Sequence, residues 1–224
     1  MINDTVEEQV AALHIEIWKH KNRFFPLGAP PEQMCQPHVA AQVMGLEYVE
    51  VDGLGRFGNG RERFETAGSL DRPNRIIAVS TRFSYPVRRF TGAHEIGHFA
   101  MHDGEIMHRD RPVFDISPNR PRHEKQADRF AAAFLAAPNL VRAEFQKRFG
   151  TKHPLPLNDT VAFYLTRGAG QELLGAPSGS LRFGIALATA QSFGNGPFTS
   201  LTSHFGVSGS AMALRLRELE LIID

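Results

Sequence analysis

The sequence predicts an α+β protein in which helices flank one short region of β-strands. Apolar residues recur at helical spacing near the N-terminus and again around residue 130. Between about residues 46 and 80, strand-like runs alternate with turn-forming clusters. With 224 residues, of which 42% are hydrophobic and 22% charged, the chain is long enough to bury a sizeable core. We therefore expect a small antiparallel sheet that packs on helices.

Two helices are predicted before the strands. The segment TVEE at residues 5–8 has the form of a capping box, and apolar residues follow it at helical spacing, which predicts a helix from about 5 to 21. Prolines then interrupt the chain, and a shorter helix is predicted for about 31–44, before Gly45. We expect both helices to serve packing.

The strand region begins near residue 46 with LEYVEV and continues with FETAGSL and RIIAVS. A turn-forming cluster at residues 71–74 separates the last two runs, as expected for a hairpin. The segment DGLGRFGNG at residues 52–60 is rich in glycine. It lacks both a G-x-G-x-x-G pattern that opens a helix and the lysine of a P-loop. The sequence therefore gives no support for nucleotide binding there.

The segment RRFTGAHEIGHFAMHD carries the strongest chemical signal in the chain. A serine and a proline at residues 84–86 are typical of a helix start, which predicts a helix over about 86–102. On such a helix His94 and His98 lie one turn apart and can direct two imidazole nitrogens at one metal ion. Glu95 points about 100° further round the helix, which suits a general base better than a ligand.

A second helix is predicted from HEKQADRFAAAFLAAP, residues 123–138. Its apolar residues follow the i, i+3, i+4, i+7, i+8 spacing of one helix face, so we expect a buried helix that ends before Pro138. The residues of this face are Ala127, Phe130, Ala131, Phe134 and Leu135. From 139 to 224 the sequence predicts several short helices joined by turns.

Catalytic zinc usually takes three protein ligands, so a third donor is expected beyond the two histidines. His102 continues the series of histidines but lies too far along the helix, and the third-histidine position of the metzincin pattern is occupied by Gly104. His123 is a further candidate. Glu124 is better placed, because it extends the buried face of the second helix, where an unpaired carboxylate would be costly.

Asp128 lies one turn after Glu124 on the same side of the helix. Its carboxylate can accept the free ring N–H of a ligating histidine, a contact that fixes the orientation of the ring. The alternative for both acids is a solvated helix start, where carboxylates interact favourably with the helix dipole.

The metal interpretation predicts peptide-bond hydrolysis by metal-activated water, with Glu95 as the base. Tyr164 or His204 could assist as an electrophile, but nothing in the sequence places either one at the metal.

Three ordered segments resemble the ImmA/IrrE family of metallopeptidases, namely FTGAHEIGHFAMH, EKQADRFAAAFLAAP and LTSHFGVSGSAMALRLREL. The hairpin segment AGSLDRPNRIIAVS also fits, so the resemblance covers roughly residues 60–220. Ile96 stands where leucine is common, and Ala136-Ala137 replaces larger apolar residues, but neither departure touches a proposed ligand.

The resemblance implies that His94, His98 and Glu124 hold the metal and that Glu95 is the base. It also implies a protein substrate, because members of the family cleave helix-turn-helix transcriptional repressors. The expected metal is Zn²⁺, with another divalent ion such as Mn²⁺ as the alternative. We expect a zincin-like catalytic domain at residues 1–150 and a helical C-terminal region at 151–224.

Residues 197–219 suggest a competing function, because two helical segments around a glycine-containing turn have the outline of a helix-turn-helix. Arg215 and Arg217 would lie on the second helix, but late in it, whereas base contacts usually come from its beginning. Glu218 and Glu220 offset their charge. Binding of nucleic acid is therefore the less favoured alternative, and a metal-binding scaffold without cleavage activity is another.

Composition limits the remaining function classes. The longest apolar run, residues 130–137, is far shorter than the roughly 18 residues of a membrane span. The acidic N-terminus does not fit a secretory signal, and the single cysteine, Cys35, excludes an internal disulfide, so we expect a cytoplasmic protein. A net charge of +1 gives no broad attraction to nucleic acid or membranes.

Overall fold

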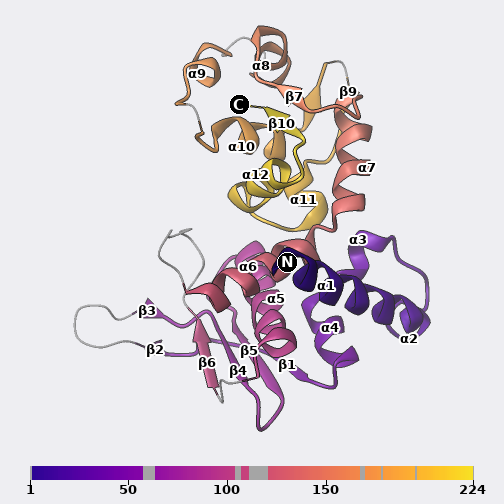
Figure 1. The fold of residues 1–224 in the computed structure, drawn as a ribbon, viewed down its shortest axis with the longest axis vertical. Helices are drawn as coiled ribbons and strands as arrows, with labels where there is room; N and C mark the ends of the chain where they lie inside the picture. The colour runs from indigo at the N-terminus through magenta and orange to yellow at the C-terminus, as the bar shows by residue number, and fades with distance from the viewer. Residues whose placement is uncertain are drawn as a thin grey trace. The chain divides into compact units, whose positions relative to one another are not determined.

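The computed structural model describes residues 2–57, 64–103, 107–110, 121–166, 170–177, 179–194 and 196–223. Gly104 and the end of the glycine-rich segment, residues 58–60, lie outside the described residues. The chain forms two compact units, Met1–Leu135 and Ala136–Asp224, and the α+β class is confirmed (Figure 1). The domains predicted at 1–150 and 151–224 stay a prediction, because compactness alone does not define a domain.

The first unit contains helices at its start, then strands, and then the two helices that carry the motif residues. Its elements are α1 (Ile2–Lys19), α2 (Lys21–Phe24), α3 (Pro31–Met34), α4 (Pro37–Val43), β1 (Glu47–Val51), β2 (Arg56–Phe57), β3 (Phe64–Glu65), β4 (Gly68–Asp71), β5 (Ile76–Ser80), α5 (Tyr85–Met101), β6 (Met107–Asp110) and α6 (Arg122–Leu135).

The N-terminal helices differ from the prediction in two places. Helix α1 begins at Ile2, so residues 5–8 lie inside the helix and the predicted capping box is wrong. The helix predicted at 31–44 is divided into α3 and α4, because a proline restricts the residue before it to extended backbone. Gln36, which precedes Pro37, has φ −105° and ψ 128°. The apolar face of α1 is buried as its spacing predicts, at Val10, Leu13 and Ile17.

Strands β1, β5, β4 and β6 form one sheet in that order. β4 and β5 are an antiparallel hairpin, as predicted, with Leu70 opposite Ile77. β1 runs parallel to β5, so the sheet is mixed rather than antiparallel throughout. β6 pairs with β4 and lies between the helices predicted at about 86–102 and 123–138, where we predict no strand. Its sequence MHRD has no alternation of apolar and polar residues from which a strand could be predicted.

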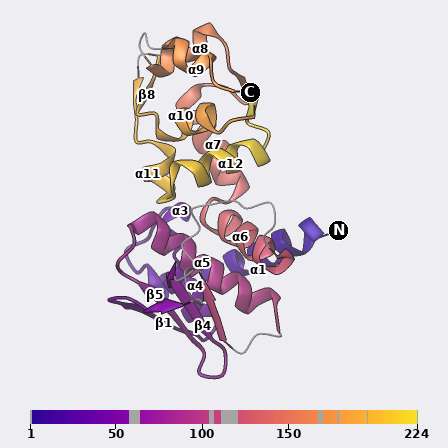
Figure 2. The ribbon, with the colours of Figure 1, turned by 90° about the vertical axis from the view of Figure 1, so that its left-hand side faces the viewer.

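Helix α5 lies at the centre of the first unit. It packs against β4 and β5 on one side and against α4 and α6 on others, and α1 packs on α6 (Figure 2). Every residue of α5 from Thr91 to His98 is buried. The predicted apolar face of α6 is also buried, with Ala127, Phe130, Ala131, Phe134 and Leu135 at most 1% exposed. The polar residues of α5 therefore lie in an interior from which most water is excluded.

Two glycines allow α5 to approach its neighbours closely. A Cβ atom at Gly97 would lie 3.0 Å from the Cβ atom of Phe130 and 3.2 Å from the Cα atom of Ala127, both on α6. A Cβ atom at Gly92 would lie 2.4 Å from the hydroxyl oxygen of Tyr48 on β1. The Gly97 distances are tighter than most real Cβ contacts, and the Gly92 distance is shorter than real Cβ atoms show, so a larger residue at either position would require its neighbours to shift.

The second unit consists of short helices and two-residue strands. Its elements are α7 (Pro138–Phe149), β7 (Leu155–Pro156), α8 (Asp159–Thr166), α9 (Gly170–Leu174), α10 (Arg182–Thr189), β8 (Ser192–Phe193), β9 (Gly196–Pro197), α11 (Leu201–Phe205), α12 (Gly209–Glu218) and β10 (Ile222–Ile223).

The helix pair predicted at 197–219 is present as α11 and α12. Gly206 ends α11 in the left-handed region, with φ 60°, and the serine side chains at the two helix starts accept hydrogen bonds from backbone N–H groups. Across the described residues, no helix combines the length and the apolar character that a bilayer span requires.

We expect Gly97→Ala to lower the free energy of unfolding by up to about 2 kcal/mol, because the added methyl group must displace the α6 backbone at a cost of about 1–3 kcal/mol. The better helix propensity of alanine, worth about 1 kcal/mol, offsets only part of this cost. Denaturant unfolding followed by circular dichroism measures the change. Gly209→Ala, at the start of α12, is the control, because a Cβ atom there lies 3.4 Å from Thr189, an ordinary contact. A Gly97→Ala protein as stable as the wild type would contradict the close packing of α5 on α6.

Candidate metal centre

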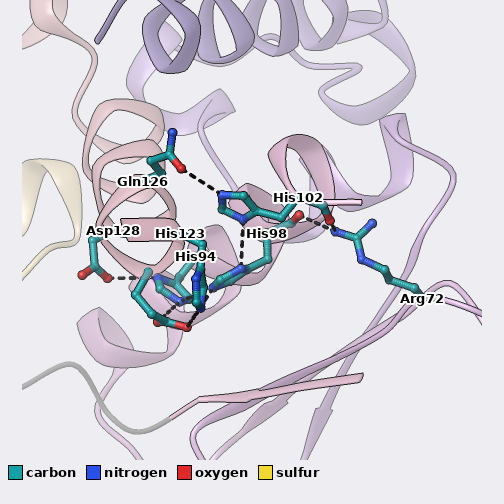
Figure 3. A network of polar contacts seen from close by, with 8 residues as sticks. Arg72, His94, His98, His102, His123, Gln126 and Asp128 are labelled. Atoms are coloured by element: carbon teal, nitrogen blue, oxygen red, sulfur yellow. Dashed lines mark hydrogen bonds and ion pairs between the residues drawn. The ribbon is translucent and has the colours of Figure 1, made fainter. Parts of the chain in front are cut away.

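Helix α5 brings His94 and His98 together in the interior of the first unit (Figure 3). His94 is 0% exposed and His98 is 1% exposed. Because the two residues are one helical turn apart, their rings meet edge to face, and the two Nε2 atoms are 3.0 Å apart. The histidine pair of the sequence motif is therefore a pair in space as well.

Glu124, in the first turn of α6, reaches the same point. Its Oε2 atom lies 3.3 Å from Nε2 of His94, and its Oε1 atom lies 3.6 Å from Nε2 of His98. The Glu124 side chain is 12% exposed, which disfavours the alternative of a solvated helix start. Within the described part of the chain, His94, His98 and Glu124 form the group that could hold a metal ion, with ligand atoms within 4.8 Å of one another.

The spacing of these atoms fits a divalent cation. Tetrahedral zinc binds nitrogen and oxygen ligands at about 2.0–2.2 Å, so its ligand atoms are about 3.3–3.6 Å apart. The separations in the cluster are 3.0, 3.3 and 3.6 Å. A carboxylate that is largely removed from water is stabilised by a positive partner, and a cation held by all three side chains would be one. The residues present therefore fit a metal, and the chemistry of the donors agrees with the geometry.

Asp128 lies on the other side of the His94 ring. Its Oδ1 atom is 3.0 Å from Nδ1 of His94, and its side chain is 24% exposed. One turn of α6 separates it from Glu124, so the same helix provides a carboxylate for each nitrogen of this imidazole. A proton held on Nδ1 by Asp128 leaves the lone pair on Nε2, the nitrogen that faces Glu124.

Glu95 is 0% exposed and lies beside strand β4. A Cβ atom at Gly68 would lie 3.0 Å from Oε1 of Glu95 and 2.3 Å from Cγ2 of Thr91. The missing side chain at Gly68 therefore leaves the space between α5 and the sheet that the Glu95 carboxylate uses. This position makes Glu95 available as a proton acceptor inside the unit, and its catalytic role stays a prediction.

His102 and His123 lie beside the cluster rather than in it. Nδ1 of His102 is 3.1 Å from Nδ1 of His98, so it contacts the ring nitrogen opposite the one that faces Glu124. Nε2 of His123 is 3.4 Å from Oε1 of Glu124, and the His123 side chain is 42% exposed. The sequence contains a signal for this contact, because histidine recurs at residues 94, 98 and 102. When His102 is considered only as a possible metal ligand, its contact with the His98 ring is not predicted.

Tyr164 and His204 have contacts of their own within the second unit. The Tyr164 ring lies 5.4 Å from the Phe193 ring, and Nε2 of His204 lies 3.7 Å from Oε2 of Glu144. Neither contact gives these residues a catalytic role, and we assign none to them.

Cys35 and His14 form a buried pair that resembles a nucleophile and its base. Sγ of Cys35 lies 3.5 Å from Nε2 of His14. Burial raises the pKa of the Cys35 thiol to about 12 and lowers the pKa of His14. Both groups are therefore neutral at physiological pH, and without a thiolate the pair has no nucleophile.

The two arginines of the DNA-binding alternative are engaged inside the second unit. Arg215 is 3% exposed, and its Nε donates to the carbonyl oxygen of Ala136 at 3.0 Å. Arg217 donates to the carbonyl oxygens of Gly179 and Ser180 at 3.3 and 2.8 Å. Because these guanidinium groups anchor α12 to backbone carbonyls, they are poorly placed to contact phosphates or bases, and the alternative loses support.

The fold and the site together define a class of protein. A unit with H-E-x-x-H on one buried helix and an acidic residue on a following helix has the arrangement of a metallopeptidase. Residues 56–164 match the family model of the IrrE N-terminal-like domain, which is a peptidase family. This part of the chain is therefore similar to an IrrE N-terminal-like domain, and the resemblance to the ImmA/IrrE metallopeptidases is confirmed.

The matched segment begins in β2 and ends within α8, so it includes the whole of α5 and α6. The late segment at residues 201–219, which also resembles the family in sequence, lies outside the match. No curated protein is similar enough to count as a relative.

We expect the wild-type protein to bind one divalent ion per chain and to gain thermal stability from it, because the ion binds the folded cluster and not the unfolded chain. Elemental analysis gives the stoichiometry, and melting curves with zinc or a chelator give the stabilisation. Glu124→Ala should weaken zinc binding by more than the roughly 10–100-fold that loss of an outer hydrogen-bond partner costs. Glu8→Ala, at an exposed position of α1, should leave zinc binding unchanged. Equal zinc affinity in the Glu124→Ala protein would show that the ion is held elsewhere.

Proposed function

We propose that this chain is a metal-dependent endopeptidase that hydrolyses a peptide bond in a protein substrate. The convergence of His94 and His98 from α5 with Glu124 from α6, inside an IrrE N-terminal-like domain, is the observation that carries the proposal. The buried carboxylate of Glu95, next in sequence to the first histidine, supports it further.

His94, His98 and Glu124 would hold the metal, which we propose to be zinc. Two imidazoles and one carboxylate are a donor set that zinc prefers, and three protein ligands leave a coordination position open. Manganese, the alternative, favours sites richer in oxygen ligands. When bound, the ion supplies a Lewis acid that polarises the scissile carbonyl group and brings the pKa of water to about 7.

Glu95 is proposed to act as the general base. Its carboxylate projects about 100° round α5 from His94, away from the ligand positions. There it would take a proton from the attacking water and then deliver that proton to the departing amine nitrogen. The new C–O bond would form as the water attacks, the C–N bond would then break as the amine nitrogen receives the proton, and the products would be a carboxylate and an amine. Asp128 supports the step indirectly by keeping the His94 ring in place, with its Oδ1 atom 3.0 Å from Nδ1.

A helix-turn-helix transcriptional repressor is the proposed substrate. Support comes from the confirmed resemblance to the ImmA/IrrE metallopeptidases, whose members cleave such repressors. Cleavage would release the genes that the repressor controls, so the protein would regulate transcription without contacting DNA. The cytoplasm, where such repressors act, is the proposed location, and a single buried thiol at Cys35 agrees with a reducing compartment.

Two alternatives give different experimental results. A DNA-binding regulator would bind a duplex in a salt-dependent way, and this binding would disappear with Arg215→Ala and Arg217→Ala. A metal-binding scaffold would bind zinc at His94 and His98 without cutting any partner. The contacts of Arg215 and Arg217 with backbone carbonyls weigh against the first alternative.

Glu95→Gln should retain zinc and lose roughly 10²–10⁴-fold in cleavage rate, because glutamine has nearly the same shape but cannot accept the proton. The assay incubates the zinc-loaded protein with a repressor-like protein encoded beside it and maps the cut by mass spectrometry. Zinc content and zinc affinity are measured on the same samples.

Glu47→Gln, at an exposed position of β1, is the matched control and should cleave like the wild type. Cleavage by Glu95→Gln at the wild-type rate would remove Glu95 as the base. Zinc binding by the wild type without cleavage of any repressor tested would favour the scaffold alternative.

A further inference from the structure

A chain of polar contacts extends from Nδ1 of His98, the ring nitrogen opposite the one that faces Glu124. Figure 3 shows this chain running through His102 to Gln126. Nδ1 of His98 lies 3.1 Å from Nδ1 of His102. Nε2 of His102 lies 3.4 Å from Oε1 of Gln126 on α6. The chain therefore begins at a proposed metal ligand on α5 and ends at an uncharged side chain on α6.

The proton positions along this chain follow from the chemistry of imidazole. A neutral histidine carries one N–H and one lone pair, so each ring can donate on one side only. His98 can offer its Nε2 lone pair to a metal only if its proton is on Nδ1. That Nδ1–H then donates to Nδ1 of His102, which must hold its own proton on Nε2 and donate it to the amide oxygen of Gln126. If His102 instead donated its proton to Nδ1 of His98, the proton of His98 would lie on Nε2. That nitrogen could then not bind a metal.

The backbone at the end of α5 holds His102 in reach of His98. His102 is the residue after the helix, with φ −129° and ψ 106°, and its N–H still donates to the His98 carbonyl oxygen at 3.0 Å. Arg72, from the turn between β4 and β5, donates to the carbonyl oxygens of His98 and His102 and, at 3.4 Å, to that of Phe99. Because one guanidinium group binds both backbone carbonyls, it holds the backbone of His98 and the backbone of His102 close together.

We propose that His102 and Gln126 are positioning residues that hold His98 in the tautomer that binds the metal. This inference rests on the metal site of the proposed function and adds two residues outside the ligand set. His94 and His98 are supported differently. The partner of His94 is the carboxylate of Asp128, whereas the partner of His98 is a neutral imidazole that in turn needs the Gln126 oxygen.

Nuclear magnetic resonance tests the proton positions directly. Long-range ¹H–¹⁵N correlations of the zinc-loaded protein, recorded where histidines are neutral, distinguish the two tautomers of each ring. We expect His98 to be protonated on Nδ1 and His102 to be protonated on Nε2. A proton on Nδ1 of His102 would overturn the proposal.

Zinc affinity, measured by competition with a chelator, tests the consequence with a pair of variants. Asparagine can place an amide oxygen near the position of the His102 Nδ1 atom, whereas leucine fills a similar volume without an acceptor. His102→Leu should weaken zinc binding by roughly 10–100-fold, and His102→Asn should stay within about threefold of the wild type. If His102 served only to fill space, the order would reverse, because asparagine is the smaller side chain.

A second pair of variants, at Gln126 on α6, tests the same consequence through zinc affinity. Gln126→Glu keeps an oxygen acceptor for Nε2–H of His102 and should retain zinc affinity, whereas Gln126→Met removes it and should weaken binding. This pair decides the question if His102→Leu does not fold, which circular dichroism would reveal. Equal affinity of Gln126→Met and Gln126→Glu would contradict the proposal.

Failure of the inference and failure of the metal site give different results. If the wild type binds zinc, His94→Ala loses it, and the leucine and methionine variants bind like the wild type, then only the roles of His102 and Gln126 are wrong. If His94→Ala binds zinc as the wild type does, the metal site itself is wrong, and the inference is overturned with it.

Discussion

The candidate metal centre depends on how closely α5 and α6 approach each other. Its donors lie on two helices, so a change in the separation of the helices changes the ligand geometry directly. Gly97 removes the side chain that would keep the helices apart, and Ala127 and Phe130 pack against the α5 backbone instead. Complete burial of a side chain such as Phe130 or Phe134 contributes about 1.5–3 kcal/mol. Apolar packing therefore determines where the carboxylate of Glu124 lies, although Glu124 itself contributes little to that packing.

The same packing creates the electrostatic requirement that a metal would satisfy. α5 is enclosed by the sheet, α4 and α6, and yet it carries two imidazoles and a carboxylate on its buried turns. The surroundings of each group are specific. Asp128 contacts His94, His102 contacts His98, and the missing side chain of Gly68 gives Glu95 its space. Polar groups at such a depth are retained when they have partners, and a cation would be one partner that His94, His98 and Glu124 could share.

Local helix geometry made the cluster of His94, His98 and Glu124 predictable. A four-residue spacing puts His94 and His98 on one face, and the apolar stripe of α6 indicates which side of that helix Glu124 occupies. The features that could not be predicted depend on distant parts of the chain. β1 runs parallel to β5 because the chain passes through β2, β3 and β4 between these two strands. The residues MHRD form strand β6 by pairing with β4, and their own sequence does not indicate this pairing. The contact between His102 and His98 depends on the place where α5 ends, and there Arg72, from a hairpin turn 30 residues before His102, donates to the backbone carbonyl oxygens of both histidines.

Arg72 also connects parts of the first unit that would otherwise open separately. Its guanidinium group joins the β4–β5 turn to the last carbonyls of α5 and stacks 5.2 Å from the Phe99 ring. The hairpin cannot separate from the helix end without breaking these bonds, so the two should undergo local unfolding as one cooperative segment. A ligand bound at His98 would then slow hydrogen exchange in the hairpin as well as in the helix, although no residue of the hairpin is a proposed ligand.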